Sequence, residues 1–172
     1  MTPVNHPSLP PAGTFWGTGR PAFPDAPAPV YAIEAAVERW KAAGVQAVVS
    51  LMEADEIHDN CPGLHEALHR HGLEVIHFPI RDYGVPADLD AFHDLLADLR
   101  SRLARGQDVL VHCNGGLGRT AVVLAGLLRA GGFEGDPVAE VRRVYQRRAM
   151  LEPAQEAFAR AFAPDDRGRR RR

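Results

Sequence analysis

The sequence DVLVHCNGGLGRT, residues 108–120, joins a short apolar run to a glycine-rich turn. The apolar run has the composition of a buried strand, and the residues after the turn, from about 117 to 130, have that of an apolar helix. The backbone N–H groups of such a turn and of the first helical residues have no partners within the helix. They face outward with the positive end of the helix dipole. The segment therefore predicts an anion-binding site.

The side chains in this turn indicate which anion it binds. Cys113 and Arg119 are six positions apart, and three of the five residues between them are glycine, which lets successive amides converge on one phosphoryl group. The planar Arg119 guanidinium can bind two phosphate oxygens, and the field at the turn favours the nucleophilic thiolate of Cys113. The alternative, a buried cysteine before an ordinary glycine turn, does not account for the glycines, Arg119 and Thr120 at these offsets.

Further strands and helices are expected on both sides of this segment. Short β-rich runs predict strands over 45–51 and 73–78, and helical patterns begin at Val30, near 63 and at Asp88. Two more helices are expected after Asp136 and near 153–163. Strands that alternate with helices predict an α/β fold, with a central, largely parallel sheet of four to five strands flanked by helices on both faces.

The composition divides the chain into three parts. Residues 1–29 contain 8 of the 14 prolines and are expected to form a Pro/Gly-rich arm, extended along the domain or partly loose. Residues 30–163 form the predicted globular domain, which contains the glycine-rich turn. Residues 164–172 hold five arginines and are expected to be a basic, disordered tail.

The sequence resembles a known family at the glycine-rich turn and beyond it. His112-Cys113-x5-Arg119-Thr120 resembles the signature loop of cysteine-dependent protein tyrosine phosphatases, and the Gly-Gly-Leu-Gly-Arg run is similar to the compact dual-specificity type, closest to the kinase-associated phosphatase-like group. Residues 77–86 resemble the family's general-acid loop, and Asp82 falls on the position of the catalytic aspartate.

Two weaker likenesses flank these segments. Residues 48–51, with Glu53 and Glu56, resemble a strand and loop of the group. Residues 149–155 resemble its glutamine-bearing segment, which places Gln155 at the glutamine, although Leu151 and Glu152 stand where the family has a Glu-Thr pair.

The resemblance implies a phosphatase that works through a phosphocysteine intermediate and needs no metal or cofactor. Cys113 is the expected nucleophile, Asp82 the acid and then the base, and Thr120 the hydrogen-bond donor to the sulfur. His112 is expected to hold the loop through its backbone. The phosphate would be bound by the backbone of the loop and by the guanidinium, that is by Asn114, Gly115, Gly116, Leu117, Gly118 and Arg119.

The substrate follows less directly from the sequence. Because residues 114–118 contain no Lys or Arg, phosphotyrosine, phosphoserine or phosphothreonine in a protein is favoured over a highly charged inositol phosphate. A small phosphorylated metabolite or lipid is an alternative, and so is a non-catalytic phospho-binding module on the same fold.

A histidine pattern and the second cysteine each allow two interpretations. His65-Glu66-Ala67-Leu68-His69 matches H-E-x-x-H, a zinc-binding pattern, but an ordinary polar helix face is the simpler interpretation. Cys61 is either a redox partner of Cys113 or a lone thiol.

The overall charge and hydropathy limit the possible partners. Residues 1–166 carry 15 basic and 22 acidic side chains, so specific binding of nucleic acid is not expected. The sequence contains no apolar run of membrane-spanning length. Two cysteines cannot form a disulfide framework, so a cytoplasmic protein is expected. A monomer is expected as well.

Overall fold

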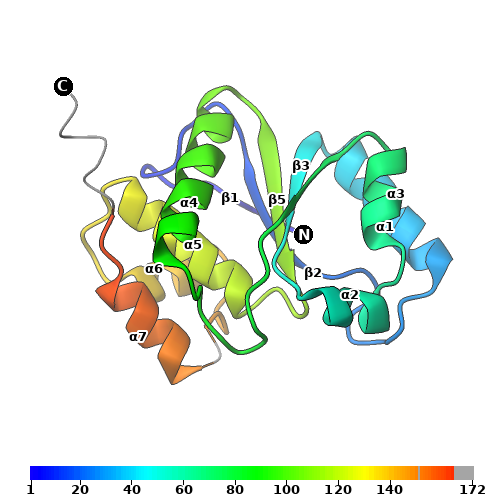
Figure 1. The fold of residues 1–172 in the computed structure, drawn as a ribbon. Helices are drawn as coiled ribbons and strands as arrows, with labels where there is room; N and C mark the ends of the chain where they lie inside the picture. Colours follow the sequence, from blue (N-terminus) through cyan, green and yellow to red (C-terminus); the bar gives the residue numbers. More distant parts are fainter. Residues whose placement is uncertain (151, 165–172) are drawn as a thin grey trace.

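One five-stranded sheet lies at the centre of the computed structural model, which describes residues 1–150 and 152–164 (Figure 1). The strands lie in the order β1-β2-β5-β3-β4. Only β1 is antiparallel to its neighbour, and the other pairs are parallel, so the predicted, largely parallel sheet is confirmed. The strands are β1 (Thr2–Val4), β2 (Phe15–Gly19), β3 (Val45–Ser50), β4 (Glu74–His77) and β5 (Asp108–Cys113).

Helices cover both faces of the sheet, as the alternation of elements predicts (Figure 1). One face packs against α4 (Leu89–Ala104), α5 (Arg119–Ala130), α6 (Pro137–Val144) and α7 (Pro153–Ala161). The other face packs against α1 (Val30–Ala42) and α3 (Leu64–Arg70), and α2 (Ala54–Asn60) lies below the carboxyl ends of the strands. None of the described helices is long and apolar enough to cross a membrane.

Strand β5 divides its side chains between these two faces. Val111 and Cys113 belong to the apolar cluster on the α5 side, whereas Leu110 belongs to the cluster on the α1 side. The His112 ring lies 6.0 Å from the Trp40 ring of α1, also on the α1 side. Successive side chains of a strand point to opposite faces, so Cys113 and the histidine before it face different layers.

The first 29 residues differ most from the expectation. Instead of only lying along the domain, this segment supplies β1 and β2, and β2 pairs with β5 from Phe15 opposite Val109 to Gly19 opposite Cys113. Glycines weaken the strand pattern of residues 15–19, which hides the strand from a propensity argument. Packing requires one of them, because a Cβ on Gly17 would lie 2.5 Å from the Tyr145 ring.

Helix α2 was not predicted either, since the sequence indicated a loop there. Its first turn is closed by a capping box: the Glu53 side chain accepts from the backbone of Glu56, and the Glu53 N–H donates to Glu56 Oε2 at 2.9 Å. The predicted tail falls, apart from Pro164, outside the described residues, and so does Leu151.

Candidate active site

The glycine-rich turn joins the carboxyl end of β5 to the first residue of α5, at the lower edge of the sheet in Figure 1. Gly116 has a φ of +74° and packs directly against β2. A Cβ at this position would come within 2.5 Å of the Gly19 nitrogen and the Thr18 carbonyl carbon. The turn can therefore close against β2 only with glycine at position 116.

The Cys113 sulfur lies at the base of a pocket formed by this turn. The side chain is 2% exposed, and its Sγ accepts from the backbone N–H of Gly116 at 3.2 Å and from the Thr120 hydroxyl at 3.3 Å. Both groups donate to the sulfur, an arrangement that suits a thiolate. Thr120 and Gly116 are thus both within hydrogen-bond distance of the sulfur.

Arg119 lies buried beside the sulfur, with its guanidinium held from several sides. Glu56 of α2 binds it in a bidentate ion pair, with Nη1–Oε2 and Nη2–Oε1 distances of 2.6 and 2.9 Å. The Ile80 carbonyl accepts from Nη1 at 2.8 Å. Burial alone would lower the pKa of Arg119, but Glu56, with the Cys113 sulfur and Asp82, outweighs it and raises the pKa. The guanidinium is therefore fixed in place and charged.

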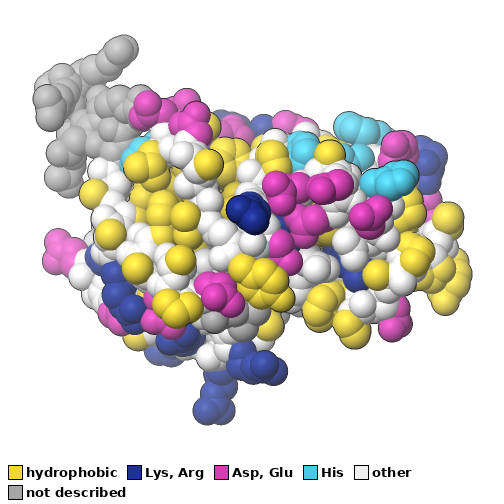
Figure 2. All heavy atoms as spheres, turned by 60° about the horizontal axis from the view of Figure 1, so that its bottom comes forward, with side chains coloured by type: hydrophobic (Ala, Val, Ile, Leu, Met, Phe, Trp, Pro, Cys, Tyr) yellow, Lys and Arg dark blue, Asp and Glu magenta, His cyan; other side chains and the backbone are white. Residues whose placement is uncertain are grey.

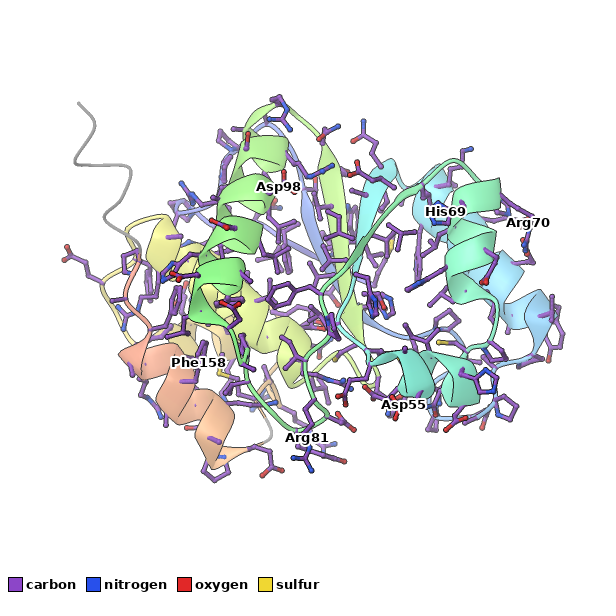
Figure 3. The ribbon with its side chains drawn as sticks, viewed as in Figure 1. Asp55, His69, Arg70, Arg81, Asp98 and Phe158 are labelled. Atoms are coloured by element: carbon purple, nitrogen blue, oxygen red, sulfur yellow. The ribbon has the colours of Figure 1, made fainter. Side chains whose placement is uncertain are left out.

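Asp82 approaches the same guanidinium from the loop before α4. Its Oδ1 lies 2.7 Å from Arg119 Nη2 and also accepts the Tyr83 N–H at 3.0 Å. Figure 3 shows Arg81 of this loop and Asp55 of α2 at the edge where the strands end. A phosphate bound at Nη2 would compete with the Asp82 carboxylate for the guanidinium.

Gln155 of α7 is the residue whose position the sequence left most open. Its side chain is 1% exposed and touches the turn at Gly118, where a Cβ would lie 2.9 Å from the amide. Nε2 donates to the Gly84 carbonyl at 3.0 Å, whereas Oε1 is buried with no hydrogen-bond partner among the described residues. The residues that line the pocket are Phe23, Asp82, Tyr83, Cys113, Asn114, Gly115, Leu117, Gly118, Arg119 and Gln155.

Arg20, for which no sequence motif predicts a role, ties the N-terminal segment to the turn. The side chain is 5% exposed, and its Nε donates to Asn114 Oδ1 at 2.8 Å. Its backbone N–H donates to the Asn114 carbonyl at 2.9 Å, and its remaining guanidinium donors bind carbonyls of residues 21, 24 and 25. These contacts fix Asn114 in the turn and place Phe23 at the mouth of the pocket.

His112 contributes to the site through its backbone. Its carbonyl accepts from the Leu51 N–H at 3.0 Å, which links the end of β5 to the loop after β3. Burial lowers the pKa of His112 to about 3, so the ring is neutral at physiological pH. The ring lies in the α1 layer and not in the pocket, which leaves it no direct part in proton transfer.

The remaining cysteine and the histidine pattern lie outside this pocket. Cys61 is a free, fully buried thiol in the apolar cluster on the α1 side, and burial raises its pKa to about 11. The His65 ring packs 5.3 Å from the His77 ring. Within residues 1–150 and 152–164, no group of three or more His, Cys, Asp or Glu side chains is arranged to hold a metal ion.

Comparisons with known proteins give consistent results. A family model described as "Polymorphic toxin system, DSP-PTPase phosphatase" matches residues 25–132. Cyclin-dependent kinase inhibitor 3 of Sus scrofa is 33% identical over 97 residues, which are 56% of this chain and 45% of that protein. This chain therefore spans about half the length of that curated relative.

Two solved structures share the fold over most of their length. Kinase-associated phosphatase, with its catalytic-site cysteine substituted by serine, superposes with a TM-score of 0.73 at 23% identity, covering 85% of this chain and 82% of that one. Tk-PTP in its active form superposes with a TM-score of 0.66 at 27% identity, covering 85% of this chain and 87% of that one.

Proposed function

This chain belongs to the polymorphic toxin system DSP-PTPase phosphatase family, and we propose that it hydrolyses phosphomonoesters through a phosphocysteine intermediate on Cys113. One observation carries the proposal. The Cys113 sulfur accepts hydrogen bonds from Gly116 and Thr120 at the base of a pocket that also holds the Arg119 guanidinium. A nucleophile and a guanidinium that can bind two phosphate oxygens thus share one small site.

In the first step the Cys113 thiolate attacks phosphorus, an S–P bond forms and the bond to the ester oxygen breaks. Arg119 and the amides of the turn hold the other phosphate oxygens, so positioning and charge stabilisation supply most of the rate enhancement. Asp82, displaced from Arg119 by the phosphate, gives its proton to the leaving oxygen.

In the second step water attacks the phosphocysteine, Asp82 takes a proton from that water, and the S–P bond breaks to release inorganic phosphate. Thr120 stabilises the departing sulfur through its hydroxyl. Gln155 lines the pocket, and its buried Oε1 accepts no hydrogen bond from the described residues, so this side chain is the proposed acceptor that orients the attacking water.

We infer that the substrate is a phosphorylated protein, with phosphotyrosine favoured over phosphoserine and phosphothreonine. Phe23 and Tyr83 line the mouth of the pocket with exposed fractions of 50% and 60%, which offers aromatic surface to an aryl phosphate. The interior of the turn adds no cation to Arg119. A small phosphorylated metabolite or lipid is the alternative substrate class, and the free thiols fit a reducing, cytoplasmic setting.

The proposed function is tested by turnover of an aryl phosphate by wild type, Cys113→Ser and the matched control Cys61→Ala. We expect Cys113→Ser to lose turnover while it still binds vanadate, and Cys61→Ala to retain both. Activity is expected to persist in chelator. If wild type binds vanadate but turns over no aryl or alkyl phosphate, the protein is a phospho-binding module. Equal turnover in Cys113→Ser and wild type would refute the mechanism.

A further inference from the structure

A second hollow adjoins the catalytic pocket on the side of α6. Its lining includes four arginines, Arg142, Arg143, Arg147 and Arg148, on the end of α6 and the turn that follows it. We call residues 142–148 the arginine turn. Leu117 lines both this hollow and the catalytic pocket, so the two are immediate neighbours.

One hydrogen bond from the arginine turn and one from Met150, just after it, attach this part of the chain to the phosphate-binding turn. The Tyr145 hydroxyl donates to the Gly116 carbonyl at 2.6 Å, and the Met150 N–H donates to the Leu117 carbonyl at 2.8 Å. Tyr145 is 8% exposed and packs beside Gly17 of β2. The position of the second hollow relative to the nucleophile is therefore fixed by buried contacts.

The four arginines divide into two pairs. Arg142 binds Glu156 at 2.6 Å and the Ala149 carbonyl, and Arg143 pairs with Glu140. Arg147 and Arg148 are exposed, and no carboxylate in residues 1–150 or 152–164 forms an ion pair with either of them. Arg142 and Arg143 are thus paired with carboxylates, whereas Arg147 and Arg148 present positive charge to solvent.

The opposite side of the catalytic pocket carries the opposite charge. Helix α2, which reaches Arg119 through Glu56, also bears Asp55 and Asp59, and both are exposed. In Figure 2, Asp and Glu side chains gather on the right of this face, and Lys and Arg side chains project from its lower part. The electrostatic field across the pocket is therefore asymmetric.

From this arrangement we propose that the arginine turn is a second anion-binding subsite, in which Arg147 and Arg148 bind an acidic or phosphorylated residue next to the phosphoresidue of a peptide substrate. A small ligand with several phosphates around one ring would bring negative charge toward α2, where it is repelled. An extended peptide can place its second anion on the arginine side alone. The inference rests on the proposed function and specifies its substrate.

The test compares kcat/KM for three substrates: a phosphotyrosine peptide with flanking glutamates, the same peptide with alanines, and an aryl phosphate with no second anion. Two exposed charge contacts predict that wild type prefers the glutamate peptide to the alanine peptide by about ten-fold. The preference should decrease as salt is raised. A peptide with a second phosphate in place of the glutamates shows which of the two anions binds better.

The variant Arg147→Gln/Arg148→Gln should lose this preference and keep the aryl phosphate rate. The matched control is Arg39→Gln/Arg105→Gln, which changes two exposed arginines of α1 and the C-terminal end of α4. This control should change neither the preference for the glutamate peptide nor the aryl phosphate rate. Arg147→Glu/Arg148→Glu should favour a peptide with flanking lysines.

The outcomes separate the two proposals. The subsite is refuted if wild type hydrolyses the aryl phosphate but treats the two peptides alike, or if the glutamine variant keeps the preference. The proposed function fails instead if the aryl phosphate is not hydrolysed at all. In that case the subsite is judged by the affinity of Cys113→Ser for the same peptides, with the same expected ratio.

Discussion

The phosphate-binding turn and the N-terminal segment contribute to the same pocket in contrasting ways. The turn, residues 113–120, supplies the proposed nucleophile, the Arg119 guanidinium and the backbone amides from one continuous stretch. The N-terminal segment, residues 1–29, supplies no reacting group, yet it pairs β2 with β5, packs Gly19 against Gly116 and holds Asn114 through Arg20. The groups that surround the phosphate site in the turn are thus local in sequence, whereas the geometry that supports them depends on distant residues.

The largest effect is expected at Asp82, the proposed acid. Asp82→Ala should reduce kcat for an alkyl phosphate such as phosphoserine by about 10²–10⁴-fold, because the leaving alkoxide needs a proton. An aryl phosphate with an acidic phenol should be affected far less. Steady-state kinetics over a series of leaving groups measures this difference.

Asp88 is the control, since its carboxylate caps α4 by accepting from the Ala91 N–H at 3.0 Å. Asp88→Ala should affect good and poor leaving groups alike. If Asp88→Ala discriminates between them and Asp82→Ala does not, the acid is misassigned.

The next effect concerns Glu56, a distant residue that contacts the catalytic guanidinium directly. Glu56→Gln removes the charge that holds Arg119, so kcat/KM should fall by about ten-fold to a hundred-fold. Vanadate affinity should fall in parallel. The matched control Glu66→Gln, on α3, should leave both unchanged. An unaltered vanadate affinity in Glu56→Gln would show that the ion pair does not position Arg119.

His112 allows a comparison within β5, because it directly precedes Cys113 but its side chain faces the α1 layer. Its pKa is lowered in the fold, from an unfolded value near 6.5 to about 3, so acidification protonates the unfolded state first and stability falls as pH drops below 6.5. Between pH 7 and 5 wild type should lose about 2 kcal/mol more unfolding free energy than His112→Asn. Denaturant unfolding at both pH values measures this difference, and equal losses would contradict a buried neutral ring.

The smallest expected effect tests the N-terminal segment itself. Arg20→Gln removes the donors that hold Asn114, and about a ten-fold loss of kcat/KM is expected. If the role is positioning, vanadate affinity should fall while the leaving-group dependence set by Asp82 is unchanged. Arg39→Gln is the control. Full activity in Arg20→Gln would show that the turn keeps its shape without the segment.

The same contrast explains how much the sequence could predict. The fold class follows from alternating strand and helix patterns, and the turn follows from residues at fixed offsets. Both can therefore be predicted from short sequence patterns. Asp82 was predicted from a likeness of its loop, and the structure places its carboxylate 2.7 Å from Arg119. Its role as the acid is still a prediction.

Other parts of the site depend on tertiary contacts that no local pattern reveals. Glu56 reaches Arg119 across 63 positions of sequence, and Arg20 reaches Asn114 across 94. The capping box at Glu53 and Glu56 was the available signal for α2. Gln155 stands in a segment that departs from the family pattern, yet α7 brings it against Gly118. Strand β2 was hidden by its glycines, which packing requires.

The most direct test of the central claim is to trap the covalent intermediate. Asp82→Ala, which lacks the base of the second step, is mixed with an aryl phosphate, quenched in denaturant, digested and analysed by mass spectrometry. We expect one phosphoryl group on the peptide that contains Cys113, and none on that peptide in Cys113→Ser. Release of inorganic phosphate with no adduct at Cys113, or with the adduct on another residue, would contradict it.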